Sequence, residues 1–430
     1  MSNVVQFENF NLVKQIGKGA FSNVYLCQNN SESLFGRMEY NEYFIIKEIN
    51  IKTLVAKYVA SNKNRGRDVE YVSQACQSMV NITPFQENMF EKTQEYEYYE
   101  NRLTDLIKSE VEILKLIEHQ NIIKFHDCTF NDDMFFIHME YCNGGDVYEY
   151  LKRELRVSND FVYGFANQVS LGLMYLHDKG IIHRDIKPHN ILMTLPLSFK
   201  LSDFGFSCYD LSIKTPSDCD YQDTLCKKYF KLCGTPYYMA PELLLNMKRL
   251  ENFTSYKKQK AGGSEARSAF YSSKVDCWSF GVCLYEILCN SLPFPSISDI
   301  RELESFFRRK DAQAYINGKV QRIKDTCLKM LIEKLLQIDQ GHRYSMAQVQ
   351  ETLCHNHNHS PTRKQGSIYE MLKGSTTCED PCLKKHIVGN PIKTEDIGSW
   401  VDVGATSGSS SVIMNVSVAN GFMKWLMNNK

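Results

Sequence analysis

Short apolar stretches predict the first elements of the chain, and two of them flank a glycine-rich segment. Residues 10–28 read FNLVKQIGKGAFSNVYLCQ, which predicts two strands joined by a tight loop. The apolar run EYFIIKEI predicts a third strand that ends near Lys47. Farther along, one face of a predicted helix carries residues at three- and four-residue steps: Leu106, Glu110, Leu114 and Ile117.

Composition excludes several classes of protein. Lys and Arg number 50, as do Asp and Glu, so the formal net charge is 0, and we expect no nucleic-acid partner. The apolar fraction of 43% excludes a fully disordered chain. No apolar run reaches the ~20 residues of a membrane span, so we expect no transmembrane segment. The N-terminus is unlike a signal peptide, and 15 irregularly spaced Cys predict reduced thiols in a cytoplasmic protein.

The glycine-rich segment and Lys47 are candidates for binding an anion. Gly17 and Gly19 lack the Cβ atoms that keep a backbone away from phosphates, so main-chain N–H groups can face phosphate oxygens. An ordinary β-hairpin is the alternative, and the spacing is not that of a Walker loop. Lys47 is either an exposed strand-end charge or an anion ligand. Glu110 is its candidate partner, because a carboxylate on the apolar face of a helix is costly unless it is paired.

A dense cluster of polar residues in the centre of the chain indicates chemistry. Residues 181–207 read IIHRDIKPHNILMTLPLSFKLSDFGFS. Oxygens of Asn190 and Asp203 suit Mg²⁺, which prefers one or two protein ligands beside phosphates and water. Asp185 is placed to accept the proton of an attacking hydroxyl, and Lys187 to neutralise a transferring phosphoryl group. The alternative is a loop of scattered polar residues.

His-Arg-Asp…Asn and Asp-Phe-Gly, in this order after the glycine-rich segment and Lys47, resemble the eukaryotic protein kinase family over about residues 10–353. The resemblance implies an α+β bilobal fold that uses ATP and Mg²⁺. A small antiparallel β lobe with one regulatory helix spans about 10–140, and a larger, mostly helical lobe spans about 144–353. ATP-binding roles are implied for Ile16, Gly17, Lys18, Gly19, Ala20, Val24, Lys47, Glu110, Glu140, Cys142, Asp146, Leu192 and Asp203. Catalytic roles are implied for Asp185, Lys187 and Asn190, and metal binding for Asn190 and Asp203.

The same resemblance implies roles for residues outside the central cluster. Met139 resembles the gatekeeper before a hinge that holds adenine, and Asp146 is expected to reach the ribose. Asp276 is expected to brace the catalytic loop, and Glu242 is expected to pair with Arg343.

The acceptor class and a closer resemblance also follow from short strings. Lys187-Pro188 after the catalytic Asp, with Thr235 after Gly234, resembles the serine/threonine branch, which implies protein substrates with Ser/Thr acceptors. MEYCNGGDVYEYL and LCGTPYYMAPELL resemble the autophagy-initiating serine/threonine kinases. Those relatives often place a Thr where this chain has Lys231.

Some positions depart from the family pattern. Ile45 replaces the usual Ala two positions before the phosphate lysine, and we expect it to press on adenine. His189 replaces an acid found in kinases that favour an upstream Arg. Lys47 and Glu110 lie 63 positions apart, which predicts an insertion over about 52–103. It is interpreted as a solvated surface loop or as a regulatory element pressing on the Glu110 helix.

The activation segment is also long. Arg184 beside the catalytic Asp predicts control by phosphorylation, because its charge seeks an anion. Thr224 is the first candidate for the phosphosite; the others are Thr215, Ser217 and Tyr229. Residues 248–267 are interpreted as a solvated loop.

Residues 354–430 are expected to form a flexible C-terminal tail. Trp400 and Val403 follow two acids and resemble a motif that binds ubiquitin-like modifiers by adding a strand to a sheet. The Cys and His of CHNHNH, which begins at Cys354, are either metal ligands or an accidental alternation. The final apolar segment is expected to dock on the kinase domain or on a partner, and membrane contact is a further alternative.

Two functions of different classes remain at this point. The first is an active kinase that transfers the γ-phosphoryl group of Mg-ATP to protein Ser or Thr. The second is a pseudokinase or scaffold that acts through its insertions and tail. Retention of Lys47, Asp185, Asn190 and Asp203 favours the enzyme.

Overall fold

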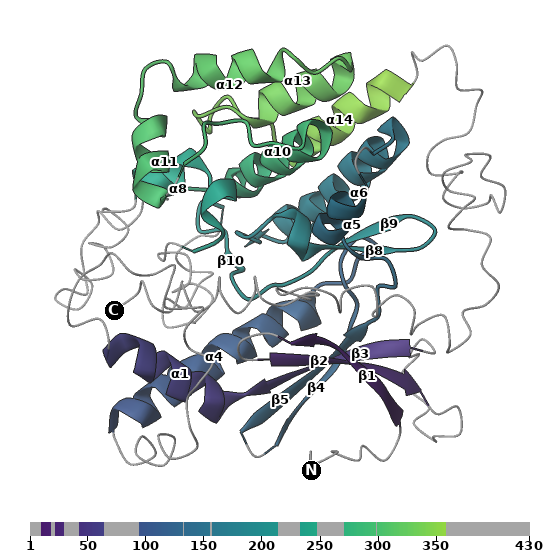
Figure 1. The fold of residues 1–430 in the computed structure, drawn as a ribbon, viewed down its shortest axis with the longest axis vertical. Helices are drawn as coiled ribbons and strands as arrows, with labels where there is room; N and C mark the ends of the chain where they lie inside the picture. Colours follow the sequence, from purple (N-terminus) through teal and green to yellow (C-terminus); the bar gives the residue numbers. More distant parts are fainter. Residues whose placement is uncertain are drawn as a thin grey trace.

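The first lobe is built on a five-stranded antiparallel sheet. A computed structural model describes residues 10–18, 22–29, 43–63, 94–131, 133–154, 157–213, 233–246, 271–297 and 299–357. The sheet has the strand order β1-β2-β3-β5-β4 (Figure 1). Its strands are β1 (Phe10–Lys18), β2 (Ser22–Asn29), β3 (Tyr43–Asn50), β4 (Phe125–Asn131) and β5 (Met134–Glu140). The two strands predicted around the glycine-rich segment are therefore confirmed as the antiparallel pair β1–β2.

Two helices lie against this sheet, and they correct one expectation. They are α1 (Ile51–Lys63) and α4 (Gln94–Leu116), which pack on each other (Figure 1). The interpretation of residues 52–103 as a solvated loop is wrong at both ends, because Leu54, Val55 and Leu103 are buried in the main apolar core. Apolar residues at helical spacing bury one face of each helix. Residues 64–93 lie outside the described part.

The second lobe is mostly helical. Its central helix α10 (Lys274–Cys289) is buried on nearly its whole circumference, as expected for a helix with apolar residues on all sides. The other described helices of this lobe are α5 (Val147–Arg153), α6 (Asn159–Asp178), α8 (Pro241–Leu245), α11 (Ile300–Phe307), α12 (Ala312–Val320), α13 (Thr326–Leu335) and α14 (Met346–His357). The helix α14 runs past the predicted start of the flexible tail at residue 354, so that boundary is wrong by four residues.

Short strands and 3-10 turns occupy the region between the lobes. A three-stranded sheet has the order β6-β8-β9, and β10 pairs with β7. The elements are β6 (Gly145–Asp146), β7 (Ile181–Ile182), η1 (Pro188–Asn190), β8 (Ile191–Thr194), β9 (Ser198–Leu201), β10 (Cys208–Tyr209) and η2 (Pro236–Tyr238). The arrangement confirms the predicted α+β bilobal fold.

The lobes share one continuous apolar core. The backbone of the segment after α4 bonds to the end of β9, where Ile123 N–H donates to the carbonyl of Leu201 at 2.9 Å. Buried side chains of both lobes belong to one cluster. In the described part of the chain, no helix is long and apolar enough to cross a membrane.

Candidate active site

The glycine-rich turn opens one side of the site. Gly17 pairs with Val24 and Lys18 with Asn23 at the end of the β1–β2 ladder, next to a register shift between Gln15 and Gly17. Lys18 is exposed and Gly17 is buried. The predicted phosphate-binding residues Gly19 and Ala20 lie outside the described residues.

Lys47 and Glu110 form the predicted ion pair. Nζ of Lys47 lies 2.9 Å from Oε1 of Glu110, and both side chains are buried. Burial by itself lowers the pKa of Lys47, but the charges of Glu110 and Asp203 outweigh it and hold that pKa above its ordinary value. A charged ammonium group is thus fixed at the inner face of β3, next to the carboxylate of Asp203.

Apolar side chains predicted to contact adenine gather in one place. Val24 stands opposite Lys47 in the β2–β3 ladder, and Ile45 stands opposite Met139 in the β3–β5 ladder. These residues belong to the main core cluster together with Cys142 and Leu192, and Ile16 packs against it. The ladders therefore place Val24 and Ile45 on neighbouring strands, with Met139 opposite Ile45.

Two predicted nucleotide-binding residues have structural partners. Glu140 ends β5, where its Oε1 accepts from the backbone N–H of Lys124 at 2.7 Å and lies 2.9 Å from Nζ of Lys200. Asp146 caps α5, because its Oδ1 accepts from the backbone N–H of Glu149 at 2.8 Å. Burial raises the pKa of Asp146 to about 6. Its side chain is buried in this position, so the structure supports capping, and ribose binding stays a prediction.

The catalytic loop surrounds Asp185 with hydrogen-bond donors. Oδ2 accepts from Nδ2 of Asn190 and lies 2.8 Å from Nζ of Lys187. Oδ1 accepts from the backbone N–H and the hydroxyl of Thr235, at 2.9 and 2.8 Å. Burial by itself raises the pKa of Asp185, but the charge of Lys187 and these hydrogen bonds outweigh it and hold the pKa below its ordinary value. Asp185 is therefore an ionised acceptor in a fixed orientation.

Thr235 is a member of this group that the sequence did not identify as a site residue. Its hydroxyl donates to Asp185 and accepts from Nζ of Lys187 at 2.8 Å. The preceding Gly234 has φ of 108°, and a Cβ there would lie 2.5 Å from the carbonyl oxygen of Arg184. Glycine is thus required for the close approach that brings Thr235 to the loop. The position of Thr235 after Gly234 was the signal that could have found it.

Asp203 fits the role of a metal ligand. Both of its carboxylate oxygens are buried and have no hydrogen-bond partner among the described residues. Burial raises the pKa of Asp203 to about 6, against the opposing charge of Lys47. Near Gly205, a Cβ would meet Oδ1 of Asp203 at 3.4 Å and Oε2 of Glu110 at 3.5 Å, so the absent side chain leaves room beside the carboxylates. A buried carboxylate with unused lone pairs is suited to Mg²⁺.

Asn190 and Asp203 meet because of a strand hairpin. Asn190 directly precedes β8, Asp203 is the second residue after β9, and Ile191 pairs with Leu201 at the open end of that hairpin. Asp203 has a positive φ of 66°, a conformation that is costly for a non-glycine residue and is common at functional sites.

Asp276 braces the catalytic loop, as predicted. Its carboxylate accepts from the backbone N–H groups of His183 and Arg184 at 2.9 and 2.8 Å, and it lies 2.9 Å from Nε2 of His177. Burial by itself raises the pKa of Asp276, but hydrogen bonds from His177 and the loop hold it below its ordinary value. His183 stands in the His-Arg-Asp motif, whereas no sequence signal indicated the contact of His177 with Asp276.

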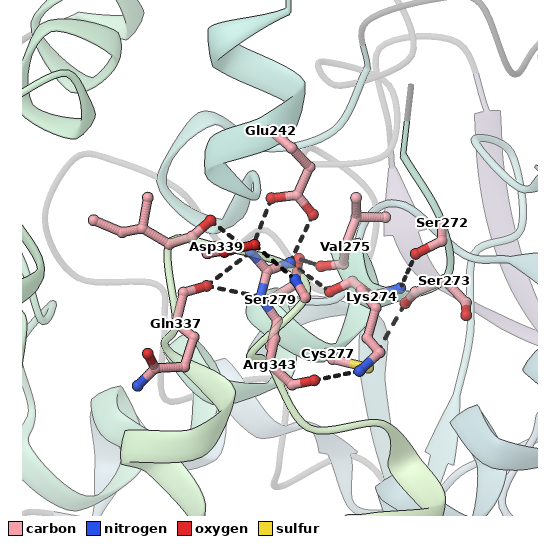
Figure 2. Close-up of polar contacts among 12 residues, drawn as sticks. Glu242, Ser272, Ser273, Lys274, Val275, Cys277, Ser279, Gln337, Asp339 and Arg343 are labelled. Atoms are coloured by element: carbon pink, nitrogen blue, oxygen red, sulfur yellow. Dashed lines mark hydrogen bonds and ion pairs between the residues drawn. The ribbon is translucent and has the colours of Figure 1, made fainter. Parts of the chain in front are cut away.

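The predicted pair of Glu242 and Arg343 is also present (Figure 2). The guanidinium donates to both carboxylate oxygens, at 2.6 and 2.8 Å. It also donates to the backbone carbonyls of Lys274 and Gln337, and it lies over the ring of Trp278. The start of α8, after the activation segment, is thereby fixed to the segment between α13 and α14.

Arg184 has partners within the protein. Its Nε donates to the carbonyl of Phe206 at 2.8 Å, and Nη1 donates to the hydroxyl of Tyr271 at 2.9 Å. Tyr271 lies 87 positions away, and no sequence signal indicated this contact. The predicted phosphosites lie outside the described residues: Thr215, Ser217, Thr224 and Tyr229. Lys231, where the family pattern often has a Thr, lies outside them too. The loop predicted over 248–267 lies outside them as well.

His189, which stands where some kinases have an acid, packs against a neighbouring aromatic ring. The ring of His189 stacks on Tyr148 with centroids 3.7 Å apart. Burial and the charges of Lys187 and Lys152 lower the pKa of His189 to about 4. A neutral imidazole therefore lies beside the catalytic loop.

Most of the tail predictions cannot be placed. Trp400, Val403 and the final apolar segment lie outside the described residues. Cys354 is exposed and His355 contacts the carbonyl of Glu351 within α14. Within the described ranges, no group of three metal-binding side chains occurs.

Comparisons with known proteins agree with this geometry. The family model "Protein kinase domain" matches residues 86–355. Serine/threonine-protein kinase ULK1 of Homo sapiens is 31% identical over 241 residues, which cover 54% of this chain and 19% of that protein. Serine/threonine-protein kinase cds1 of Schizosaccharomyces pombe is 30% identical over 283 residues, 64% of this chain and 55% of that protein. Serine/threonine-protein kinase ATG1a of Arabidopsis thaliana is 31% identical over 211 residues, 48% of this chain and 28% of that protein.

The matches cover only part of this chain and part of each relative. The chain spans about a fifth to about half of the length of these relatives. The family match begins after Lys47, so the lysine side of the site is placed by the structure.

Proposed function

The chain belongs to the protein kinase domain family, and we propose that it is an active serine/threonine kinase that transfers the γ-phosphoryl group of ATP to protein hydroxyls. The observation that carries the proposal is the buried pair of Lys47 and Glu110 at 2.9 Å, formed beside the carboxylate of Asp203, which has no hydrogen-bond partner among the described residues. A scaffold needs neither a buried ion pair nor an unpaired buried carboxylate, because both are costly to maintain.

The residues of this chain divide the work of phosphoryl transfer. Lys47 holds the phosphates of ATP, and Glu110 holds Lys47. The acceptor hydroxyl oxygen forms a bond to the γ-phosphorus while the bond to the leaving oxygen of ADP breaks, and the hydroxyl proton passes to Asp185. Lys187 neutralises charge on the transferring group. The hydroxyl of Thr235, which donates to Asp185 and accepts from Lys187, orients both.

Asn190 and Asp203 are the residues that would hold Mg²⁺. The ion supplies positive charge that stabilises the phosphate oxygens and fixes their orientation. The buried, unpaired oxygens of Asp203 support this assignment. The carboxamide of Asn190 is oriented by its donation to Asp185.

The proposal is tested by phosphate transfer from labelled ATP with Mg²⁺ to a degenerate Ser/Thr peptide library. Wild type is compared with Asp203→Ala and with Asp178→Ala, a matched control at an exposed position of α6. We expect transfer by wild type and Asp178→Ala, and none by Asp203→Ala. A folded wild type that transfers no phosphate, even after treatment with an activating kinase, would support the scaffold.

Pathway, partners and location form a finer part of the proposal. We propose a role in autophagy or stress signalling, supported by the strings shared with the autophagy-initiating kinases and by the similarity to ULK1 and ATG1a. We also propose that the protein works in the cytoplasm and that Trp400 and Val403 bind a ubiquitin-like modifier. Pull-down of such modifiers by the full chain, lost with Trp400→Ala, tests the last point. Binding unchanged by that substitution would refute it.

A further inference from the structure

The helix that carries Glu110 extends far beyond it. Upstream of Glu110, α4 carries an unbroken buried stripe at three- and four-residue steps: Tyr96, Tyr99, Leu103, Leu106 and Ile107. At 1.5 Å per residue, Tyr96 lies about 21 Å along the helix from Glu110. An apolar stripe of this length is stable only when another element covers it.

The helix α1 covers the upstream half of that stripe. Figure 1 shows α1 beside the N-terminal part of α4, and the two helices pack on each other. Ile51, Leu54 and Val55 of α1 are at most 1% exposed. The hydroxyl of Tyr96 donates to the carbonyl of Lys52 at 3.2 Å. The contact therefore combines apolar burial with a hydrogen bond that fixes the alignment of the two helices.

The start of α1 is fixed to β3, the strand that carries Lys47. Asn50 ends β3 and caps α1, since its Oδ1 accepts from the backbone N–H of Thr53 at 2.8 Å. The backbone N–H of Ile51 donates to the carbonyl of Asp133 at 2.9 Å. Nζ of Lys52 lies 2.9 Å from the carboxylate of the same Asp133. The junction of β3 with α1, which lies three residues after Lys47, is thus attached to the turn between β4 and β5.

These contacts close a ring around the ion pair. From Lys47 it follows β3 into α1, crosses to α4, and returns through Glu110 to Lys47. We infer that α1 is an internal clamp that holds α4 in the position where Glu110 meets Lys47, so that Leu54 and Val55 are positioning residues for phosphate transfer. The inference rests on the proposed kinase function and extends it to the segment between Lys47 and Glu110.

Loosening the contact of α1 with α4 should disturb the ion pair of Lys47 and Glu110. Truncating Leu54 removes buried contacts and leaves a cavity at the contact of α1 with α4. A loosened α4 takes Glu110 away from Lys47 in part of the molecules and leaves a buried ammonium unpaired. Lys47 then loses its fixed orientation toward the phosphates. We therefore expect weaker ATP binding and slower transfer without any change in the catalytic loop.

The test is a double-mutant cycle between the clamp and the ion pair. Leu54→Ala, with or without Glu110→Gln, is compared with Leu331→Ala, a matched truncation of a buried leucine in α13. We expect Leu54→Ala to lower kcat/KM for ATP by about tenfold alone and by less than about twofold in the Glu110→Gln background. Leu54→Met, which conserves volume, should restore most of the activity. Leu331→Ala should lower kcat/KM by a similar factor in both backgrounds, or not at all.

Equal effects of Leu54→Ala in the two backgrounds would overturn the inference, because the residue would then act on stability alone. Amide hydrogen exchange of α4 around Glu110 separates this result from a failure of the proposed function. We expect faster exchange there in Leu54→Ala and not in Leu331→Ala, whether or not the wild type transfers phosphate. Unchanged exchange in α4 would refute the clamp, and a wild type without transfer would refute only the kinase activity.

Discussion

Replacing Arg343 by Met should destabilise the second lobe more than neutralising its partner Glu242. Arg343 is fully buried, and its guanidinium donates to both oxygens of Glu242 (Figure 2). Methionine fills a similar space but provides no donor. The substitution leaves the carboxylate of Glu242 buried without its cation and the carbonyls of Lys274 and Gln337 without their donor.

The magnitude follows from what each substitution leaves behind. Breaking a buried ion pair by removing one partner costs about 3–5 kcal/mol. Glu242→Gln also leaves the guanidinium without its counter-charge, but the guanidinium keeps one amide oxygen and the carbonyls of Lys274 and Gln337 as acceptors. We therefore expect a smaller loss, that of charge-assisted hydrogen bonding, about 1.5–3 kcal/mol. The double variant carries no unpaired charge, so we expect it to be more stable than Arg343→Met alone.

Urea unfolding of the three variants measures these differences. The transition is followed by far-UV circular dichroism and by tryptophan fluorescence, since Trp278 lies beside Arg343. We expect the order wild type, Glu242→Gln, double variant, Arg343→Met, from most to least stable. An unfolding free energy of Arg343→Met within about 1 kcal/mol of wild type would refute it.

Three further predictions concern the active site and its approach. Asp203→Asn should abolish transfer yet stabilise the metal-free protein by about 2–3 kcal/mol at pH 7. The pKa of Asp203 is about 6 in the folded protein and about 3.9 in the unfolded chain, so the wild type loses stability as pH rises through this range. Thermal unfolding should show no difference in stability between the two proteins below about pH 4. Thr235→Ala should lower kcat about tenfold and Thr235→Ser should restore it, since the hydroxyl bonds to charged groups; equal rates would contradict this. Gly234→Ala should cost at least about 1–3 kcal/mol, because φ is 108° and the new Cβ meets Arg184, whereas Gly318→Ala in open space should not destabilise.

Local spacing predicted the catalytic cluster because short-range geometry determines it. Asn190 and Asp203 flank a hairpin of two short strands, so their proximity follows from the pairing of Ile191 with Leu201. The Glu110 helix was likewise predicted from its apolar face, although Ile117 lies just beyond its end. The pairing of Lys47 with Glu110 followed because a carboxylate on an apolar face requires a cation.

Contacts between distant segments could not be derived in this way. Glu242 and Arg343 are 101 positions apart, and only the family resemblance connected them. The contacts of Thr235 with Asp185 and of Tyr271 with Arg184 depend on how the activation segment and α10 pack. The error over residues 52–103 was avoidable in part, because Tyr96, Tyr99 and Leu103 continue the helical spacing of Leu106 upstream.

Substitution of the proposed catalytic base, Asp185, tests directly whether this site transfers phosphate. Asp185→Asn keeps the shape of the side chain and removes the proton acceptor. We predict that kcat for a Ser/Thr peptide falls by about 10²- to 10⁴-fold while the Kd for Mg-ATP stays within about threefold of the wild-type value. Transfer at the wild-type rate by Asp185→Asn would contradict the assignment of Asp185 as the catalytic base.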